Sequence, residues 1–305
     1  MKINIASKEI IHFIGIGGIG MSGLAQIMKN MGFMIQGSDI SKNKNTERLI
    51  KLGIKVRFGH NQKNLKRATI IVISSAIKKN NKELKLAKQR NLPVFKRGEM
   101  LANIVALKKN IVIAGSHGKT TTTSLVANIL LEAGLDPTVI NGGVINSFKN
   151  SAQLGKGEWA VIESDESDGS FLKLPVTYSI VTNIDKEHLE HYGSYENLKK
   201  SFFNFIEKTP SFGKALLCID SKDLKSIASK CKSNNYLTYG FNKNANYYIC
   251  DVIKKKNYSI FDLKIKIPGD KNHKIKNIKV KLLGDHNISN ATASIAIALN
   301  LGIKI

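Results

Sequence analysis

The sequence predicts an α/β protein of two consecutive domains, and three observations indicate it. Short apolar runs alternate with helical stretches through the first hundred residues, which is typical of a parallel sheet with crossover helices. The alternation starts again at Asn110–Ala114. Each half opens with a strand, a glycine-rich loop and a helix. We therefore expect one domain over residues 1–107 and a second over residues 108–305.

The first domain is expected to have three apolar strands and two helical stretches. The strands are Ile10–Ile14, Phe33–Gln36 and Ala68–Ile73, and the helices are Gly20–Asn30 and Arg97–Leu107. A strand that runs directly into a glycine loop and a helix is typical of nucleotide-binding α/β folds. This order predicts a Rossmann-like N-terminal domain.

The second domain is expected to combine parallel and antiparallel strands in one mixed sheet. Trp159–Ile162 and Tyr178–Thr182 are short, apolar and of strand type. Between residues 236 and 283 apolar and polar residues alternate with a period of two, which predicts antiparallel strands. The alanine- and isoleucine-rich stretch Ile288–Leu299 is expected to be the last helix.

Composition excludes some classes of protein and leaves others open. No apolar run reaches the roughly 20 residues that cross a bilayer, and we expect a cytoplasmic protein with no membrane insertion. The net charge of +24 raises the possibility of nucleic-acid binding. The lysines are scattered, however, so an AT-rich genome explains them better, and we expect no nucleic-acid partner. The cysteines at positions 218, 231 and 250 fit no zinc or redox spacing.

The first glycine loop, Gly15–Gly20, fits the pattern G-x-G-x-x-G directly after a strand. Its glycines permit a tight turn and a close approach of the backbone to a phosphate at a helix N-terminus. Asp39 follows 19 residues later, at the end of the next strand, where it could accept a ribose hydroxyl. A dinucleotide dehydrogenase would share this pattern, and a glycine turn without a ligand remains an alternative.

The second glycine loop is more specific. Gly115–Thr123 lies between a strand and a helix and contains G-x-x-G-K-T, although Ile113 stands where a complete Walker A motif has glycine. Backbone amides of such a loop surround phosphates, Lys119 would reach the β- and γ-phosphate oxygens, and Thr120 would bind Mg²⁺. The sequence thus predicts a P-loop-type central ATPase domain.

Two further motifs follow strands, and a third opens the last helix. The run Glu163–Asp168 holds four carboxylates in six residues, which suits Mg²⁺ but also a solvated acidic turn. His188 could bind a second metal ion or the substrate, or could be structural. The amides of Gly284–Asn290 could contact a base or ribose, although a simple N-cap would explain Asn287 equally well.

Taken in order, these motifs closely resemble those of the Mur ligase family over residues 10–302. The stretches that carry the resemblance are HFIGIGGIGMSGLA, Ser74-Ser75-Ala76, Arg97–Leu101, GSHGKTTT, Asn141-Gly142-Gly143, ESDESDGSFL, VTNI…EH…HYG and LLGDHNISNA. They look most like the member of the family that adds L-alanine.

The resemblance implies a UDP-N-acetylmuramate site in the first domain and an ATP–Mg²⁺ site in the second. The residues it assigns to the UDP-sugar are Gly15, Gly17, Gly18, Gly20, Asp39, Ser74, Ser75, Arg97 and Asn141. Those it assigns to ATP are Gly115, Ser116, His117, Gly118, Lys119, Thr120, Thr121, His286, Asn287 and Asn290. The implied metal ligands are Thr120, Glu163 and His188, and the implied catalytic residues are Lys119, Glu163 and His188.

The activity implied by the resemblance is ligation of L-alanine to the carboxylate of UDP-N-acetylmuramate through an acyl phosphate. Two departures are mild: Asn81-Lys82-Glu83 replaces an Asn-Pro-Glu, and Glu187 stands where an aspartate is common. The family also has a C-terminal amino-acid-binding domain, which we expect to be absent here. Residues 1–305 alone are therefore expected to bind nucleotides without ligating. A sister ligase that attaches a peptide to the same sugar, and an inactive nucleotide-binding fragment, remain alternatives.

Overall fold

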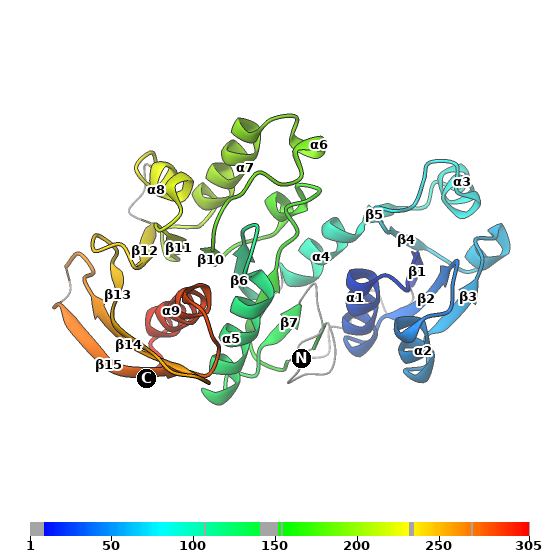
Figure 1. The fold of residues 1–305 in the computed structure, drawn as a ribbon. Helices are drawn as coiled ribbons and strands as arrows, with labels where there is room; N and C mark the ends of the chain where they lie inside the picture. Colours follow the sequence, from blue (N-terminus) through cyan, green and yellow to red (C-terminus); the bar gives the residue numbers. More distant parts are fainter. Residues whose placement is uncertain are drawn as a thin grey trace. The chain divides into compact units, whose positions relative to one another are not determined.

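The structure, a computed structural model, describes residues 9–106, 108–140, 152–153, 155–231, 235–269 and 271–304. It divides into two compact units (Figure 1). Unit 1 comprises Met1–Leu107 and Thr138–Lys156, and unit 2 comprises Lys108–Pro137 and Gly157–Ile305. Unit 1 contains a five-stranded parallel sheet and unit 2 a mixed sheet, so the predicted α/β class is confirmed.

The strand order of the parallel sheet of unit 1 reverses between its central strands. In order across the sheet, the strands are β3 (Lys55–Phe58), β2 (Met34–Asp39), β1 (Ile10–Ile14), β4 (Ile70–Ile73) and β5 (Val94–Lys96). The chain leaves β1 toward β2 and β3 on one side, and then returns to β4 on the other side. Ligands of open α/β sheets bind at the carboxyl ends of strands where the order reverses in this way.

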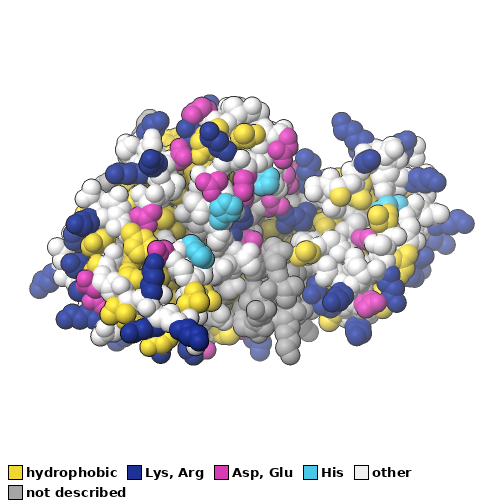
Figure 2. Space-filling model, viewed as in Figure 1, with side chains coloured by type: hydrophobic (Ala, Val, Ile, Leu, Met, Phe, Trp, Pro, Cys, Tyr) yellow, Lys and Arg dark blue, Asp and Glu magenta, His cyan; other side chains and the backbone are white. Residues whose placement is uncertain are grey.

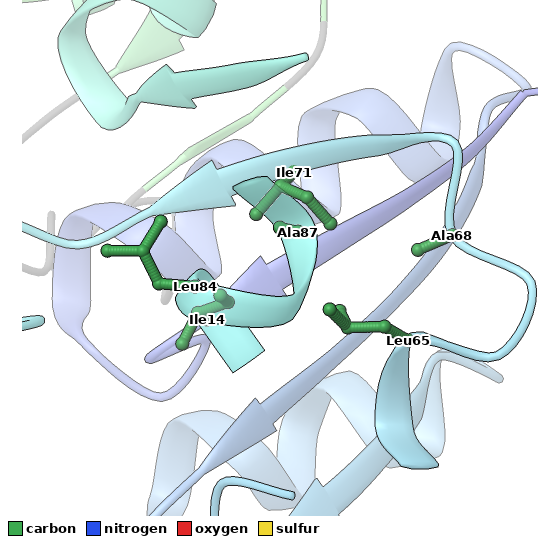
Figure 3. Packing of buried hydrophobic residues seen from close by; sticks show 6 residues of the cluster. All are labelled: Ile14, Leu65, Ala68, Ile71, Leu84 and Ala87. Atoms are coloured by element: carbon green, nitrogen blue, oxygen red, sulfur yellow. The ribbon is translucent and has the colours of Figure 1, made fainter. Parts of the chain in front are cut away.

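Three helices and a short 3₁₀ turn lie between the strands of this sheet, and a fourth helix follows its last strand. They are α1 (Ile19–Asn30), α2 (Lys44–Lys51), η1 (Gln62–Leu65), α3 (Lys82–Gln89) and α4 (Arg97–Val105). Leu84 and Ala87 of α3 pack on Ile14 and Ile71 of the sheet, together with Leu65 and Ala68 (Figure 3). All six are at most 4% exposed, so this cluster anchors β1 and β4, the strands between which the order reverses.

The sheet of unit 2 has the phosphate-loop strand between two other parallel strands. In order, its strands are β15 (His273–Val280), β14 (Ser259–Ile265), β13 (Tyr247–Lys254), β12 (Tyr236–Gly240), β11 (Ala215–Cys218), β10 (Tyr178–Val181), β6 (Lys109–Ala114) and β9 (Trp159–Glu163). The expectation of antiparallel strands from residue 236 is wrong for β12, which pairs in parallel with β11 and β13. Antiparallel pairing begins between β13 and β14.

The helices of unit 2 bring the last motif close to the phosphate loop. They are α5 (Lys119–Glu132), η2 (Ser170–Lys173), α6 (Leu189–Tyr192), α7 (Tyr195–Glu207), α8 (Lys222–Ala228) and α9 (Asp285–Asn300). Helix α9 packs against α5 (Figure 1), with Ala293 and Ala296 fully buried. A β-carbon on Gly118, the N-cap of α5, would lie 2.8 Å from Asn290 Oδ1, so the start of α9 lies beside the start of α5.

Two remaining observations complete the fold. In the stretch Thr138–Lys156, β7 (Thr138–Ile140) and β8 (Ala152–Gln153) form an antiparallel pair. Within the part of the chain that the structure describes, no helix has the length and apolar character needed to span a membrane.

Candidate functional site

The glycine loop of unit 1 is attached to the end of β2 by its own amides. The amides of Gly15 and Ile16 donate to the carbonyl of Ser38, and the amide of Gly17 donates to Asp39 Oδ2 at 2.7 Å. A β-carbon at position 17 would lie 2.9 Å from that carboxylate oxygen and closer still to two other side chains. A side chain at position 17 would have to displace these groups, so the loop has the close packing expected of the motif.

Asp39 has a structural role that the sequence did not suggest. Its side chain accepts from the Gly17 amide through Oδ2 and from the Ser41 amide through Oδ1, at 2.7 and 3.2 Å. The residue is only 8% exposed. Asp39 therefore fixes the glycine loop relative to β2, and its contact with a ribose hydroxyl stays a prediction.

A cation and a helix N-terminus meet on the other side of the loop. Gly18 is the N-cap of α1, and no side chain caps this helix. Arg97, the first residue of α4, lies so close to Gly20 that a β-carbon there would be 3.1 Å from the guanidinium Nη1. Free helix amides beside a guanidinium form a site for an anion such as a diphosphate.

The other residues assigned to this site are distributed around the same loop. The β-carbon of Ser74, just past β4, lies 3.1 Å from the position of a β-carbon on Gly15. Ser75 follows it and is exposed. Asn141 lies outside the described residues. The structure thus brings together the glycines, Asp39, Ser74 and Arg97 beyond the carboxyl ends of β2, β1 and β4.

The phosphate loop of unit 2 needs glycine at two positions. Gly115 has φ +131°, and a β-carbon there would lie 2.2 Å from Thr182 Oγ1. Gly118 has φ +82°, and its β-carbon would lie 2.8 Å from Asn290 Oδ1 of α9. Both are conformations that other residues rarely adopt, and both are tightly packed. The loop therefore has one well-defined shape between β10 and α9.

Residues that follow β10 hold this loop in place. Thr182 Oγ1 donates to the His117 carbonyl at 2.6 Å. The Asn183 side chain accepts from the His117 amide at 2.8 Å and donates to the His117 carbonyl at 3.1 Å. The Asp185 amide donates to Ser116 Oγ at 2.9 Å. In this motif the sequence pointed only to His188. The contacts of Thr182 and Asn183 with the loop were not predicted, although Thr-Asn directly after an apolar strand was a usable signal.

Lys119 opens helix α5, and its ammonium is directed into the loop. Nζ donates to the carbonyls of Gly115 and Ser116 at 2.5 and 3.1 Å, and to Glu166 Oε1 at 2.8 Å. The two carbonyl contacts hold the lysine ammonium against the loop. Thr121 follows in the first turn of α5.

The acidic run after β9 is only partly solvated, because Asp165 and Asp168 are exposed and Glu166 is buried. Ser164 and Glu166 are 3% and 4% exposed, and Ser164 Oγ donates to the Ile113 carbonyl of β6. Glu163 Oε1 accepts from Thr120 Oγ1 at 3.0 Å. Two of the three predicted metal ligands are therefore adjacent, because β9 and β6 are neighbouring strands.

The third predicted ligand, His188, belongs to a second cluster. Ligand atoms of Glu166, Glu187 and His188 all lie within 4.8 Å of one another. His117 Nε2 lies 3.0 Å from Asp185 and 3.6 Å from Glu187. Figure 2 shows acidic and histidine side chains gathered on one part of the surface of unit 2, while lysines and arginines lie over much of the remaining view. Neither Glu166 nor Glu187 was among the metal ligands expected from the sequence.

Oxygen and imidazole donors of this kind suit a hard divalent cation. Burial raises the pKa of Tyr192, and the nearby carboxylates of Glu166, Asp168 and Asp165 raise it further. The Tyr192 hydroxyl donates to the Glu166 carbonyl and so fixes the acidic turn. The residues present therefore fit Mg²⁺ at this end of the sheet.

The last motif borders a cavity of about 460 Å³ in unit 2. His286 and Asn290 line it, together with Thr182, Asn183, Asp220 and Tyr239. Asn287 points elsewhere: its amide donates to the Leu283 carbonyl at 2.7 Å and its carbonyl oxygen accepts from Asn290. The N-cap of α9 is Gly284, so the alternative that Asn287 caps this helix is wrong. The cavity adjoins the phosphate loop through Thr182 and Asn183.

Comparison with known proteins agrees with this arrangement. Residues 10–109 match the model described as "Mur ligase family, catalytic domain", and residues 113–298 match "Mur ligase middle domain". The chain is 60% identical over 304 residues to UDP-N-acetylmuramate–L-alanine ligase of Pelagibacter ubique, and 47% identical over 296 residues to that of Sinorhizobium medicae. These matches include 100% and 97% of this chain but only 66% and 63% of the relatives' lengths.

Two solved structures share its fold. UDP-N-acetylmuramate-alanine ligase MurC of Thermotoga maritima superposes with a TM-score of 0.81 at 28% identity, over 96% of this chain and 65% of that one. UDP-N-acetylmuramate:L-alanyl-gamma-D-glutamyl-meso-diaminopimelate ligase of Neisseria meningitides gives 0.84 at 26% identity, over 97% and 94%. On its family models and its relatives, the chain belongs to the Mur ligase family.

Proposed function

We propose that this chain forms the UDP-sugar-binding and ATP-binding domains of a ligase that joins L-alanine to UDP-N-acetylmuramate. The observation that carries the proposal is the shape of the second loop. Lys119 lies within a glycine loop that Thr182 and Asn183 brace, and Thr120 meets Glu163 beside it. This arrangement suits a triphosphate with Mg²⁺. The 60% identity to an L-alanine ligase supports the choice of amino acid.

Unit 1 would bind the diphosphate of UDP-N-acetylmuramate. The uncapped N-terminus of α1 and the Arg97 guanidinium offer amide donors and a positive charge to one anionic group. Asp39 would act mainly through the loop, because both of its oxygens already accept from backbone amides.

Unit 2 would position ATP and its Mg²⁺. The amides of Ser116 and His117 already donate to Asn183, so Lys119 and the other loop amides would bind the phosphates. His286 and Asn290 would contact the base and ribose in the neighbouring cavity. Thr120, Glu163, Glu166, Glu187 and His188 are the residues that would hold Mg²⁺. When bound, the ion supplies neutralisation of the negative charge on the transferring phosphoryl group.

The chemistry needs no protein nucleophile. The lactyl carboxylate attacks the γ-phosphorus of ATP, an O–P bond forms, and ADP leaves. The amine of L-alanine then attacks the acyl carbon and phosphate departs. Lys119 would stabilise the charge that spreads over the γ-phosphoryl oxygens during the first step. The roles of the chain's residues are thus binding, orientation and charge stabilisation.

Two other functions make different predictions. A dehydrogenase would bind NAD⁺ in unit 1, and the phosphate loop of unit 2 would then have no function. The sister ligase, which attaches a peptide to the same sugar, shares both nucleotide sites. The 60% and 47% identities to L-alanine ligases favour the amino-acid ligase over it.

Calorimetry with three ligands tests the proposal. We expect the protein to bind UDP-N-acetylmuramate and ATP–Mg²⁺ at one site each, and NAD⁺ not at all. Lys119→Ala should weaken ATP binding at least tenfold through loss of a charge-assisted phosphate contact and leave UDP-sugar binding unchanged. Tight binding of NAD⁺ without UDP-sugar binding would favour the dehydrogenase. ATP affinity that is unaltered in the variant would refute the assignment of the loop.

A further inference from the structure

Glu166 differs from the rest of the acidic run in its surroundings. It is 4% exposed, whereas Asp165 is exposed and accepts from Ser167. Its Oε1 accepts from Lys119 Nζ at 2.8 Å. Its Oε2 is buried and has no hydrogen-bond partner among the described residues. A buried carboxylate oxygen without a partner costs free energy, so its retention indicates a ligand.

The unpartnered carboxylate belongs to a cluster whose spacing suits one cation. One ligand atom from each of Glu166, Glu187 and His188 lies within 4.8 Å of the other two. Octahedral Mg²⁺ has bonds of about 2.1 Å, so opposite ligands are about 4.2 Å apart. Small side-chain movements would therefore bring all three atoms onto one ion. Charged groups beside the cluster include Lys119, 2.8 Å from Glu166, His117, 3.6 Å from Glu187, and Glu190, 3.8 Å from His188.

We propose that Glu166 couples cation binding to nucleotide binding. When a divalent cation occupies the cluster of Glu166, Glu187 and His188, the Glu166 carboxylate turns to it and releases Lys119, whose ammonium then binds phosphate. The inference rests on the proposed function in one respect, which is that Lys119 binds ATP.

The physical basis is competition for one ammonium group. All three donors of Lys119 are directed to the carbonyls of Gly115 and Ser116 and to Glu166. A phosphate that takes the lysine from Glu166 must break a charge-assisted hydrogen bond and leave a buried carboxylate uncompensated. A cation at the cluster compensates that carboxylate. By linkage, the cation and the nucleotide must then strengthen each other's binding by the same factor.

The test compares Glu166→Gln, Glu187→Gln and the control Asp165→Asn, which removes one charge from the same acidic run at an exposed position. Two quantities are measured separately: binding of Mn²⁺ alone by electron paramagnetic resonance, and binding of ATP in EDTA by calorimetry. Glu166→Gln should weaken Mn²⁺ binding and tighten metal-free ATP binding, each roughly tenfold. Glu187→Gln should weaken Mn²⁺ binding only. Asp165→Asn should change neither by more than about twofold.

Each outcome decides the inference. If metal-free ATP affinity is unchanged or lower in Glu166→Gln, or if Mn²⁺ binding is unchanged in Glu187→Gln, the coupling is refuted. If Glu166→Gln shows no cooperative thermal unfolding, Glu166→Asp replaces it; its shorter side chain should also loosen Lys119 and tighten metal-free ATP binding. Wild-type protein that binds no ATP under any condition would refute the proposed function as well. Loss of ATP binding in Lys119→Ala with no effect of Glu166→Gln would refute only the coupling.

Discussion

Replacement of Gly115 by alanine should destabilise unit 2 for two reasons, which are the strained backbone conformation and the overpacking of the added methyl. At φ +131° an alanine costs about 1–2 kcal/mol. The added methyl would lie 2.2 Å from Thr182 Oγ1 and 3.0 Å from the Asn183 carbonyl oxygen, and such overpacking costs about 1–3 kcal/mol. We expect Gly115→Ala to lower the free energy of unfolding by about 2–5 kcal/mol.

Urea denaturation of a double-mutant cycle separates the two parts. Thr182→Ala alone should cost about 1 kcal/mol, through loss of its hydrogen bond to the His117 carbonyl. The double variant should be more stable than additivity predicts by about 1 kcal/mol or more, since the clashing oxygen is absent. Gly134→Ala is the matched control: it also has positive φ, +74°, but no atom within 4 Å of the new methyl. Additive costs, or equal costs at the two glycines, would show that the loop does not pack on Thr182 as described.

Three other substitutions test separate parts of the account. Burial raises the pKa of Glu83, but hydrogen bonds with His12 and Ser38 outweigh it and leave the pKa below its usual value of 4.5. Glu83→Gln should therefore lower the free energy of unfolding by about 3–5 kcal/mol at pH 7. The loss should become progressively smaller as pH falls below 4.5, where the wild type loses this contribution. Urea curves showing the same loss at pH 7 and pH 4 would contradict this. Ile71→Ala should lower the free energy of unfolding by about 2–5 kcal/mol by leaving a cavity beneath α3, and a cost below 1 kcal/mol in the same assay would argue against the packing in Figure 3. His286→Ala should weaken ATP binding about threefold to tenfold by removing a polar contact without affecting the UDP-sugar, and calorimetry showing equal loss of both ligands would exclude its place in the ATP site.

Local patterns were sufficient to predict the first strands of each unit. Ile10–Ile14 and the strand ending at Ala114 are apolar runs that stop at glycine loops, and both are observed strands. The direction of Tyr236–Gly240 was not predictable in the same way. Alternation with a period of two indicates which face of a strand is buried, and it is silent about whether the neighbouring strand runs parallel or antiparallel. Here β12 is parallel to both neighbours.

The candidate site also contains some residues that the local sequence predicts and others that it does not. Lys119 and Thr120 were predictable because the loop that holds them is continuous in sequence. The contacts of Thr182 and Glu166 with that loop depend on β10 and β9 lying on either side of β6. Sheet order of this kind is a long-range property that a local motif does not encode. A buried glutamate within a run of four carboxylates also has no distinguishing sequence signal, since its burial arises from tertiary packing.

The central claim is that two separate nucleotide sites, one in each unit, serve one ligase. Calorimetric titration of wild type, Arg97→Ala and Lys119→Ala with UDP-N-acetylmuramate and with ATP–Mg²⁺ tests it most directly. We expect a crossed result: Arg97→Ala weakens only UDP-sugar binding and Lys119→Ala weakens only ATP binding, each at least tenfold. If either variant lost binding of both ligands, the assignment of one nucleotide to each unit would be contradicted. The same would follow if both variants bound both ligands as the wild type does.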